Sequence, residues 1–355
     1  MADEFVDLRP GGEQDKKKKK KSGCLIFLIV MLSLLLVALI LVAVGMNYIF
    51  GRLGHFENPE PVDGTIPKMS DEFDVEGNQE GAENFETVDA TDVVFETVDV
   101  LEGDTINIML IGQDRRPGEE RARSDSMILV TINQEKNTIQ LTSFMRDLYV
   151  QIPGYMDNRL NVAYRYGGTD LMNETFKINF GLEIDGNVMV DFDEFTDIIK
   201  ILGGVSLEMS SAEAKYMNDR YGNKFKSGMN YMNADEALDF TRMRYAAGGD
   251  YGRTDRQRRV LIAIAESFRE ADLMTIFNVI DQVLPHIVTN LTDAQIIEYA
   301  TKGLSILSNN GTMETLRIPQ DDAHYNANIR GMAVLVPNLE VCREDLQDFL
   351  FGNEG

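Results

Sequence analysis

Runs of apolar and polar residues divide the chain into an N-terminal span and a later series of short elements. Residues 24–45 are almost wholly apolar and carry no charge. Beyond residue 104, the strings TINIMLIG, SMILVTI and TIQLTSF are short apolar runs, and the polar string QEKN separates the last two. Runs of this length bounded by turn residues predict three strands, and the last two can pair as a hairpin.

Helical spacing of apolar residues follows in the second half of the chain. It occurs at residues 194–202 and 235–240, and most strongly at residues 257–280. A further helix is predicted near residues 293–308 and a strand at residues 333–336. Strands and helices mixed over about 250 residues predict one α/β domain, which we place at residues 105–355.

The N-terminal apolar span is long enough to cross a membrane. As a helix its 22 residues extend roughly 33 Å, against about 30 Å for a bilayer core. A cleaved signal peptide is the alternative, but its apolar core is usually about 7–15 residues long. Six consecutive lysines precede the span. The positive-inside rule therefore predicts a cytoplasmic tail at residues 1–23, a transmembrane helix at residues 24–50 and an extracellular remainder.

The net charge of the chain argues against one class of function. Its formal net charge is −24, from 58 acidic and 34 basic residues, which argues against direct binding of nucleic acid. Residues 51–104 hold sixteen acids and two bases. This stretch predicts a solvated acidic linker on the outer side of the membrane. The two cysteines, Cys24 and Cys342, exclude a disulfide framework.

Charged residues collect at the ends of the predicted strands. Asp114 follows the first strand, and Arg123 and Asp125 begin the second. Residues two apart on a strand point to the same face. If the second and third strands form a hairpin, the end of the third returns beside the start of the second. Arg146 lies at that end, so these four residues are expected to converge at one edge of the sheet.

A second cluster lies in the string TRMRYAAGGDYGRTDRQ at residues 241–257. Arg242 and Arg244 are two apart and would share one face of a short strand. A Gly-Gly turn then precedes Asp250. Three polar residues at spacing i, i+3, i+4 would form one face of a helix start, which itself attracts phosphate: Arg253, Arg256 and Gln257.

Together the two clusters predict a polyphosphate site. Fourteen of the twenty arginines fall between residues 115 and 259. The arginine fork pairs phosphate oxygens bidentately, and carboxylates can hold Mg²⁺ beside phosphates. Surface salt bridges between abundant acids and arginines are the alternative. The chain has no G-x-x-x-x-G-K-[ST], G-x-S-x-G or H-E-x-x-H string, so the motifs of P-loop ATPases, serine esterases and zinc proteases are absent.

Seven strings resemble the LytR–CpsA–Psr family of bacterial cell-envelope proteins over about residues 106–264. They are NIMLIGQDRR, RSDSMILVTIN, SFMRDLYVQIPG, RLNVAYRYGG, LGGVSLEM, MNADEALDFTRMR and GDYGRTDRQRRVL. The resemblance implies a single domain with a mixed central sheet flanked by helices, preceded by one transmembrane helix. It also implies a Mg²⁺-dependent phosphotransferase on the outer face of a Gram-positive-type cell membrane.

Such proteins move an anionic glycopolymer, such as teichoic acid or capsular polysaccharide, from a polyprenyl diphosphate carrier to peptidoglycan. By resemblance, Asp114 and Asp125 would bind the metal, and Asp250 would assist the metal or deprotonate the acceptor. The arginines that would bind the diphosphate and act in catalysis are Arg123, Arg146, Arg242 and Arg244. The remaining polar residues around the substrate head group would be Arg253, Arg256 and Gln257.

Two departures from the family pattern touch the backbone and no charged group. Phe144 and Met145 stand where the family usually has Ile-Pro, and Ala234 stands where it usually has Gly. Two other functions use the same residues. One is a hydrolase of polyprenyl diphosphate-linked glycan, with water as the acceptor. The other is a non-enzymatic sensor of lipid-linked polymer, of the kind called a transcriptional attenuator.

Overall fold

The structure, a computed structural model, describes most of the chain after residue 83. The described residues are 54–55, 84–96, 98–101, 103–113, 124–222, 224–243, 249–270, 275, 278, 282 and 287–352. The expected cytoplasmic tail and transmembrane helix lie outside them. Within the described residues, no helix has both the length and the apolar content to cross a bilayer.

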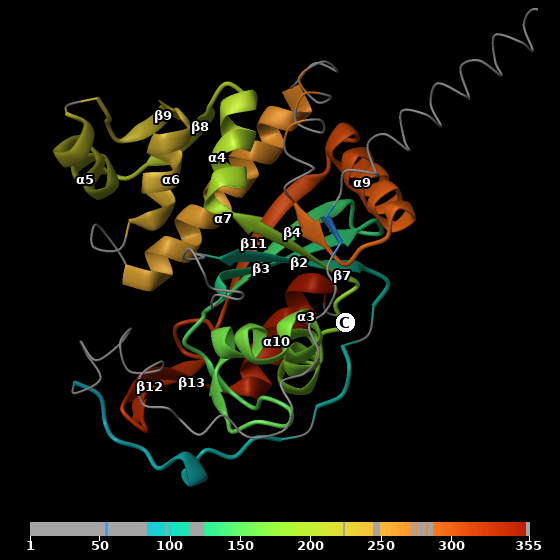
Figure 1. The fold of residues 1–355 in the computed structure, drawn as a ribbon, viewed down its shortest axis with the longest axis vertical. Helices are drawn as coiled ribbons and strands as arrows, with labels where there is room; N and C mark the ends of the chain where they lie inside the picture. Colours follow the sequence, from blue (N-terminus) through green and yellow to red (C-terminus); the bar gives the residue numbers. More distant parts are fainter. Residues whose placement is uncertain are drawn as a thin grey trace, which may run out of the picture. The chain divides into compact units, whose positions relative to one another are not determined.

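A mixed seven-stranded sheet lies at the centre of the domain (Figure 1). The neighbours β2, β3 and β4 pair antiparallel, while β7 pairs parallel to β2 and β11 pairs parallel to β4. The three strands predicted after residue 104, and the hairpin between the last two, are confirmed. In spatial order the strands are β1 (Gly54–His55), β10 (Val288–Thr289), β7 (Gly186–Asp191), β2 (Ile106–Gln113), β3 (Ser124–Asn133), β4 (Thr138–Phe144) and β11 (Thr312–Ile318).

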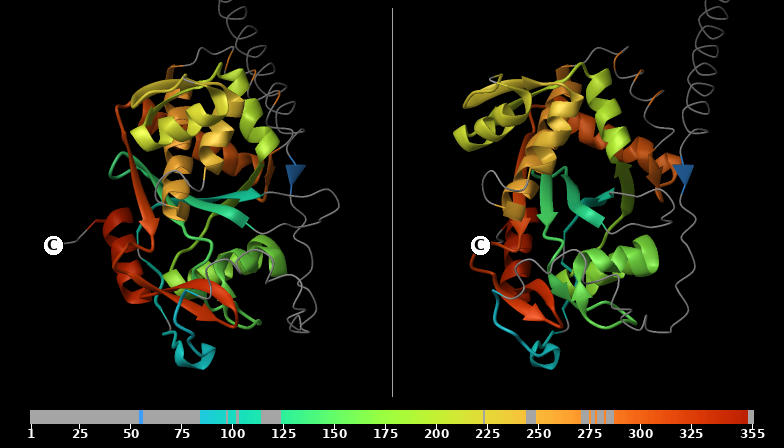
Figure 2. Two further views of the ribbon diagram at one scale, coloured as in Figure 1. Left: turned by 90° about the vertical axis from the view of Figure 1, so that its left-hand side faces the viewer. Right: turned by 60° about the vertical axis from the view of Figure 1, so that its left-hand side comes forward.

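Helices cover both faces of this sheet (Figures 1 and 2). One face carries α3 (Leu160–Phe180) and α10 (Leu339–Leu350), and the other carries α7 (Gly249–Glu270) and α9 (Asp293–Ser308). The main core lies on the α3 side, where the ring of Phe144 packs 4.7 Å from that of Phe176. Phe144 and Met145, which replace the expected Ile-Pro, are both buried and fill this core.

A smaller helical layer packs against α7 around a core of its own, which includes Met217, Phe240 and Val260. Its elements are α4 (Phe192–Ile201), β8 (Val205–Met209), α5 (Ser211–Tyr221), β9 (Gly228–Met232) and α6 (Ala234–Arg242). Helix α6 begins at a capping box, in which Asn233 and Glu236 each bond the backbone N–H of the other.

The last part of the predicted linker folds back onto the domain. Residues 84–101 contain a 3₁₀ turn, η1 (Ala90–Asp92). The Val88 N–H donates to Asn328 O at 3.0 Å, and the Leu101 N–H donates to Gly181 O at 2.8 Å. Phe95 packs beside Tyr149. The Gly181 contact lies at the C-terminal end of α3. The other contacts lie on a small layer made of β5 (Tyr149–Val150), β6 (Asn158–Arg159), β12 (His324–Ile329) and β13 (Met332–Pro337). The structure differs here from a solvated spacer, because apolar side chains of the segment find buried partners.

Candidate active site

Four strand ends meet at one edge of the central sheet. Gln113 at the end of β2 pairs with Ser124 at the start of β3, and Met127 of β3 pairs with Phe144 at the end of β4. Phe144 in turn pairs with the last residue of β11. The register therefore places at a common edge the strand ends that border the first predicted cluster in the sequence.

The structure describes the predicted site residues to different extents. Asp114, Arg123 and Arg244 lie outside the described residues. Asp125 is the second residue of β3 and Asp250 the second residue of α7, and their backbones alone are described. The side chains that the structure describes are those of Arg146, Arg242, Arg253, Arg256 and Gln257.

Helix α7 brings Thr254 and Gln257 onto the same edge. The Thr254 hydroxyl lies 3.9 Å from the sulfur of Met145, just past the end of β4. The Ser126 hydroxyl donates to Gln257 Oε1 at 3.1 Å, which joins α7 to the start of β3 across 131 positions of sequence. The first turns of α7 thus lie over the strand ends that carry Asp125 and precede Arg146.

Arg146 is held by an acid and by the backbone. Its Nε lies 3.4 Å from Asp147 Oδ2, and its side chain is 15% exposed. The other oxygen of Asp147 lies 3.3 Å from Arg159 Nη1, so one carboxylate bridges two arginines. The Arg146 carbonyl accepts from the Asn161 N–H at 3.2 Å. These contacts hold the charged side chain and the backbone of Arg146 in place just beyond the end of β4.

The predicted strand at Arg242 and Arg244 is wrong for Arg242. This residue is the last of helix α6, and its side chain is exposed. The capping box at Asn233 starts that helix, and the apolar face of the helix holds it against α4 and α7. By contrast, the helix predicted for Arg253, Arg256 and Gln257 is confirmed, because all three lie in α7. The prediction that they share one face is wrong, because Arg256 contacts Glu213 while Gln257 contacts Ser126.

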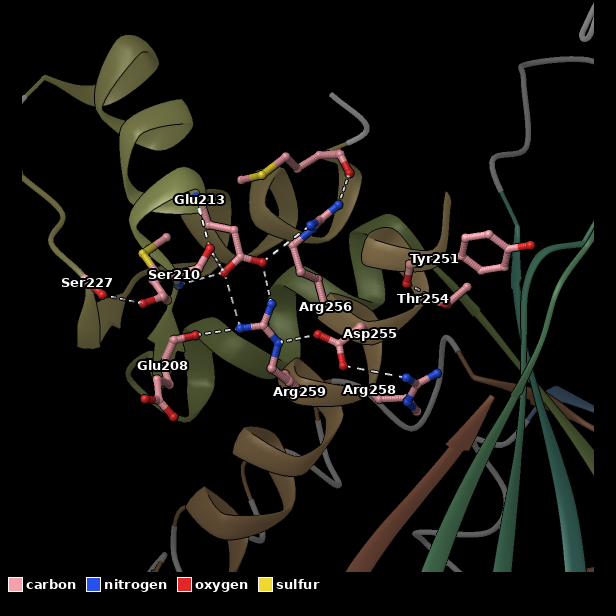
Figure 3. A network of polar contacts seen from close by, with 12 residues as sticks. Glu208, Ser210, Glu213, Ser227, Tyr251, Thr254, Asp255, Arg256, Arg258 and Arg259 are labelled. Carbon is pink, nitrogen blue, oxygen red and sulfur yellow. Dashed lines mark hydrogen bonds and ion pairs between the residues drawn. The ribbon is translucent and has the colours of Figure 1, made fainter. Parts of the chain in front are cut away.

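Arg256 and Gln257 are adjacent in α7 but face different elements. Arg256 is fully buried. Its Nη1 lies 3.4 Å from Glu213 Oε1, and its Nη2 donates to the carbonyl oxygen of Met243. Figure 3 shows Glu213 between the guanidinium groups of Arg256 and Arg259. Because Met243 directly follows Arg242, Arg256 anchors the backbone next to a predicted site arginine.

Glu213 is the acid at the centre of this network. Arg259 Nη1 donates to its Oε2 at 3.4 Å and to the Glu208 carbonyl at 2.7 Å. The Ser210 N–H also donates to Glu213, which closes the capping box of α5. Burial raises the pKa of Glu213, but hydrogen bonds from Arg259 and Ser210 outweigh burial and leave that pKa below its ordinary value. The acid is therefore held ionised between two arginines.

Sequence reasoning missed Glu213 and Asp147 as partners of the arginines. The string SSAE, in which Ser210 precedes Glu213 by three, carries the capping-box signal of a helix start. That signal places Glu213 in the first turn of α5 without indicating that it would meet Arg256. Asp147 follows Arg146 directly, and its link to Arg159 depends on the pairing of β5 with β6.

The predicted metal site consists of Asp114 and Asp125. Among the described side chains, no group of three or more acids, histidines and cysteines gathers closely enough to hold an ion. The two expected ligands, Asp114 and Asp125, belong to the segment at the strand ends whose side chains are not described. Two carboxylates with phosphate oxygens and waters suit the oxygen coordination of Mg²⁺. The metal therefore stays a prediction.

Comparison with known proteins agrees with this geometry. The model of the LytR_cpsA_psr family matches residues 72–347. A polyisoprenyl-teichoic acid–peptidoglycan teichoic acid transferase TagU from Bacillus cereus is 32% identical over 229 residues, which are 64% of this chain and 72% of that protein.

Two solved structures share the fold. TagT bound to LIIa-WTA is 25% identical, with a TM-score of 0.57 over 72% of this chain and 96% of that chain. TagV of Bacillus subtilis is 28% identical, with a TM-score of 0.54 over 70% of this chain and 98% of that chain. The mixed sheet flanked by helices is therefore the architecture of those proteins.

Proposed function

Because the chain belongs to the LytR–CpsA–Psr family, we propose that it is a membrane-anchored phosphotransferase of the cell envelope. Its donor is an anionic glycopolymer, teichoic acid foremost, linked to a polyprenyl diphosphate carrier, and its acceptor is peptidoglycan. The name of the TagU relative supports the carrier, the polymer and the acceptor. The lysine run before the apolar span supports an extracellular position for the domain.

One observation carries this proposal. Arg146 lies two residues beyond the end of β4. At this point α7 contacts the start of β3 through Gln257 and the end of β4 through Thr254. The same turns of α7 hold the buried Arg253. Arg146 and Arg253 thus belong to separate elements that pack together at one sheet edge, and two such cations would suit the bidentate binding of a diphosphate.

The chemistry follows from this arrangement of charge. The acceptor hydroxyl oxygen bonds to the phosphorus that carries the sugar. The bond from that phosphorus to the bridging oxygen breaks, and its electron pair leaves with polyprenyl phosphate. Arg146 and Arg253 stabilise the charge that develops on the leaving phosphate. Asp250, at the start of α7, is the proposed acceptor of the hydroxyl proton.

Mg²⁺ is part of the proposal and would be held by Asp114 and Asp125. It would supply positive charge to the diphosphate oxygens. The role of the protein side chains is to fix the diphosphate between β4 and α7. Arg256 contributes indirectly, because its bond to the Met243 carbonyl fixes the chain beside Arg242.

The test is a transfer assay on the full chain in detergent. A polyprenyl diphosphate-linked glycopolymer and a peptidoglycan fragment are supplied with Mg²⁺, and polymer joined to the fragment is measured. We expect Arg146→Ala to lower kcat/KM by about 10²–10³-fold, the loss typical of removing one stabiliser of a transition-state charge. Lys177→Ala, which removes an exposed cation of α3, is the matched control and should keep full activity.

Three results would contradict the proposal. Equal transfer by wild type and Arg146→Ala would show that the arginine does not act on the diphosphate. Release of polymer phosphate at the same rate with and without the peptidoglycan fragment would identify a hydrolase with water as acceptor. Binding of the donor without turnover under either condition would identify a sensor.

A further inference from the structure

Arg258 is a buried arginine that the proposed mechanism does not use. It lies on α7, one helical turn beyond Thr254, and is 7% exposed. Figure 3 shows its guanidinium pointing away from the network around Glu213. Nη2 lies 3.6 Å from Asp255 Oδ1. Nε and Nη1 are buried, and no group among the described residues accepts a hydrogen bond from either.

Burying the Arg258 guanidinium with two nitrogens unpaired among the described residues lowers the stability of the folded protein. A buried guanidinium loses its hydration and recovers the loss only through hydrogen bonds and paired charge. Burial lowers the pKa of Arg258, Asp255 opposes that shift, and the charge of Arg317 adds to it. Residues that break a packing rule in this way are expected at functional sites.

Arg317 lies on β11, a strand that packs against α7. It lies near the end of β11, and its guanidinium stacks 4.2 Å above the ring of Tyr251 in the first turn of α7. Its Nε donates to the Pro319 carbonyl at 3.0 Å, and its Nη2 pairs with Asp321. These contacts hold a second positive charge on the α7 side of the sheet.

Ser143 supplies a hydroxyl on the same face of the sheet as Arg317. It pairs with Arg317 in the parallel register of β4 and β11. Phe144 faces α3, so the alternation of the strand turns Ser143 toward α7. Met145, two residues on, meets Thr254, and Arg258 lies about 6 Å along the helix from Thr254. The Ser143 hydroxyl is buried and has no hydrogen-bond partner among the described residues.

We propose that Arg258, Arg317 and Ser143 form a second phosphate subsite, on the β11 side of the candidate active site. Three N–H bonds of Arg258 and one hydroxyl are available there, and a phosphate offers oxygens to donors arriving from a helix and two strands. The nearby acids, Asp255 and Asp321, are 50% and 89% exposed. They lie at the rim, so the interior of the subsite is positive.

The occupant is a phosphate group of the donor beyond the diphosphate, and this assignment rests on the proposed function. The chemistry alone also fits free inorganic phosphate. The subsite extends the row of strand-end residues by one strand, from β4 to β11. A polymer with phosphodiester linkages could then reach it while its diphosphate lies at Arg146.

The first experiment titrates inorganic phosphate into the full chain in detergent, followed by calorimetry and by the melting temperature. Four variants are compared: Arg258→Met, Arg317→Gln, Arg146→Ala and Arg269→Gln. Arg269 lies on the same helix, is 43% exposed and serves as the matched control. We expect Arg258→Met and Arg317→Gln to weaken phosphate binding about tenfold or more, as loss of a charge-assisted contact does. Arg146→Ala should weaken only phosphate bound at the diphosphate site, and the binding event that is lost in Arg258→Met should persist in it.

Arg258→Met should also raise the melting temperature without phosphate, because it removes a buried charge that lacks partners. A variant that melts lower and binds phosphate as well as Arg269→Gln does would overturn the subsite and make Arg258 structural. Loss of one and the same binding event in Arg146→Ala and in Arg258→Met would also overturn it, because a single site would then account for both arginines.

The second experiment separates the two sources of phosphate. Transfer is measured with a donor of phosphodiester backbone and with one of uncharged sugars, both on polyprenyl diphosphate. A rise in KM confined to the phosphodiester donor in Arg258→Met assigns the subsite to the polymer. An unchanged KM for both donors, with phosphate binding lost, assigns it to free phosphate. Failure of the transferase proposal is seen separately, as the absence of polymer joined to the peptidoglycan fragment with the wild-type protein and either donor.

Discussion

Neutralising Glu213 should destabilise the fold, because it leaves the buried Arg256 without its counter-charge. Glu213 is 4% exposed, and Arg256 opposite it is fully buried. Glu213→Gln keeps an oxygen for the capping box of α5 but removes the negative charge. Arg256 would then keep the Met243 carbonyl as a neutral partner, with no counter-charge from Glu213.

The expected loss in the free energy of unfolding comes mainly from Arg256, which would stay buried without its counter-charge. Breaking a buried ion pair by removing one partner costs about 3–5 kcal/mol, because the remaining charge stays out of water. The Arg259 side chain is 28% exposed and also pairs with Asp255 at 2.9 Å. Losing the ion pair between Arg259 and Glu213 therefore adds little to the cost. Retention of the cap argues for the low end, and we expect a loss of about 3 kcal/mol in the free energy of unfolding.

Urea unfolding of the full chain in non-ionic detergent measures this loss. The chain has no Trp, so far-UV circular dichroism is the signal. Glu298→Gln, at an exposed ion pair of α9, is the control and should change stability by less than about 0.5 kcal/mol. A double-mutant cycle with Arg256→Met should show that the second substitution recovers about 2 kcal/mol or more of the loss.

The pH dependence supplies a second check. The pKa of Glu213 is lower in the folded protein than its ordinary value of 4.5. The stabilisation is therefore present above about pH 4.5 and is lost as the pH falls through the lower, folded value. The stability gap between wild type and Glu213→Gln should narrow below about pH 4.5. A loss under about 1 kcal/mol at pH 7, or a gap that does not depend on pH, would refute the reasoning.

Three further predictions test other parts of the molecule. Phe144→Ala should cost about 3–5 kcal/mol in urea unfolding, because it opens a cavity beside Phe176; a cost below about 1 kcal/mol would contradict the packing. Burial raises the pKa of Cys342 to about 12, so in a Cys24→Ser background the thiol should resist alkylation at pH 8 until urea unfolds the domain, and rapid labelling of the native protein would count against burial. Chelation of divalent cations should abolish polymer transfer and added Mg²⁺ should restore it, whereas full transfer in excess chelator would exclude the metal.

Local sequence determined the central strands and several helices of this protein. The apolar runs gave β2, β3 and β4 correctly, because a buried strand needs apolar side chains on consecutive or alternate positions. The polar QEKN string marked the hairpin between the last two. The helix at residues 293–308 was also predicted correctly, since its spacing and its cap are properties of neighbouring residues.

Arg242 shows how a local pattern can mislead. Two arginines separated by one residue suggested a strand, while the N-x-x-E string at Asn233 marked a helix that continues to Arg242. The alternation of two charged residues is too short to decide between periods of 2 and 3.6. The cap was the stronger signal, because it bonds backbone groups that a helix start leaves open.

Only the tertiary structure decided which charges meet. Arg256 was predicted to face the substrate, yet it is buried beside Glu213, whose position depends on the packing of α5 against α7. Ser143 and Arg317 lie in distant segments, and β11 brings them together by pairing with β4. Periodicity and caps act between residues close in sequence. Ion pairing and burial act between residues close in space, and that proximity exists only after the sheet has formed.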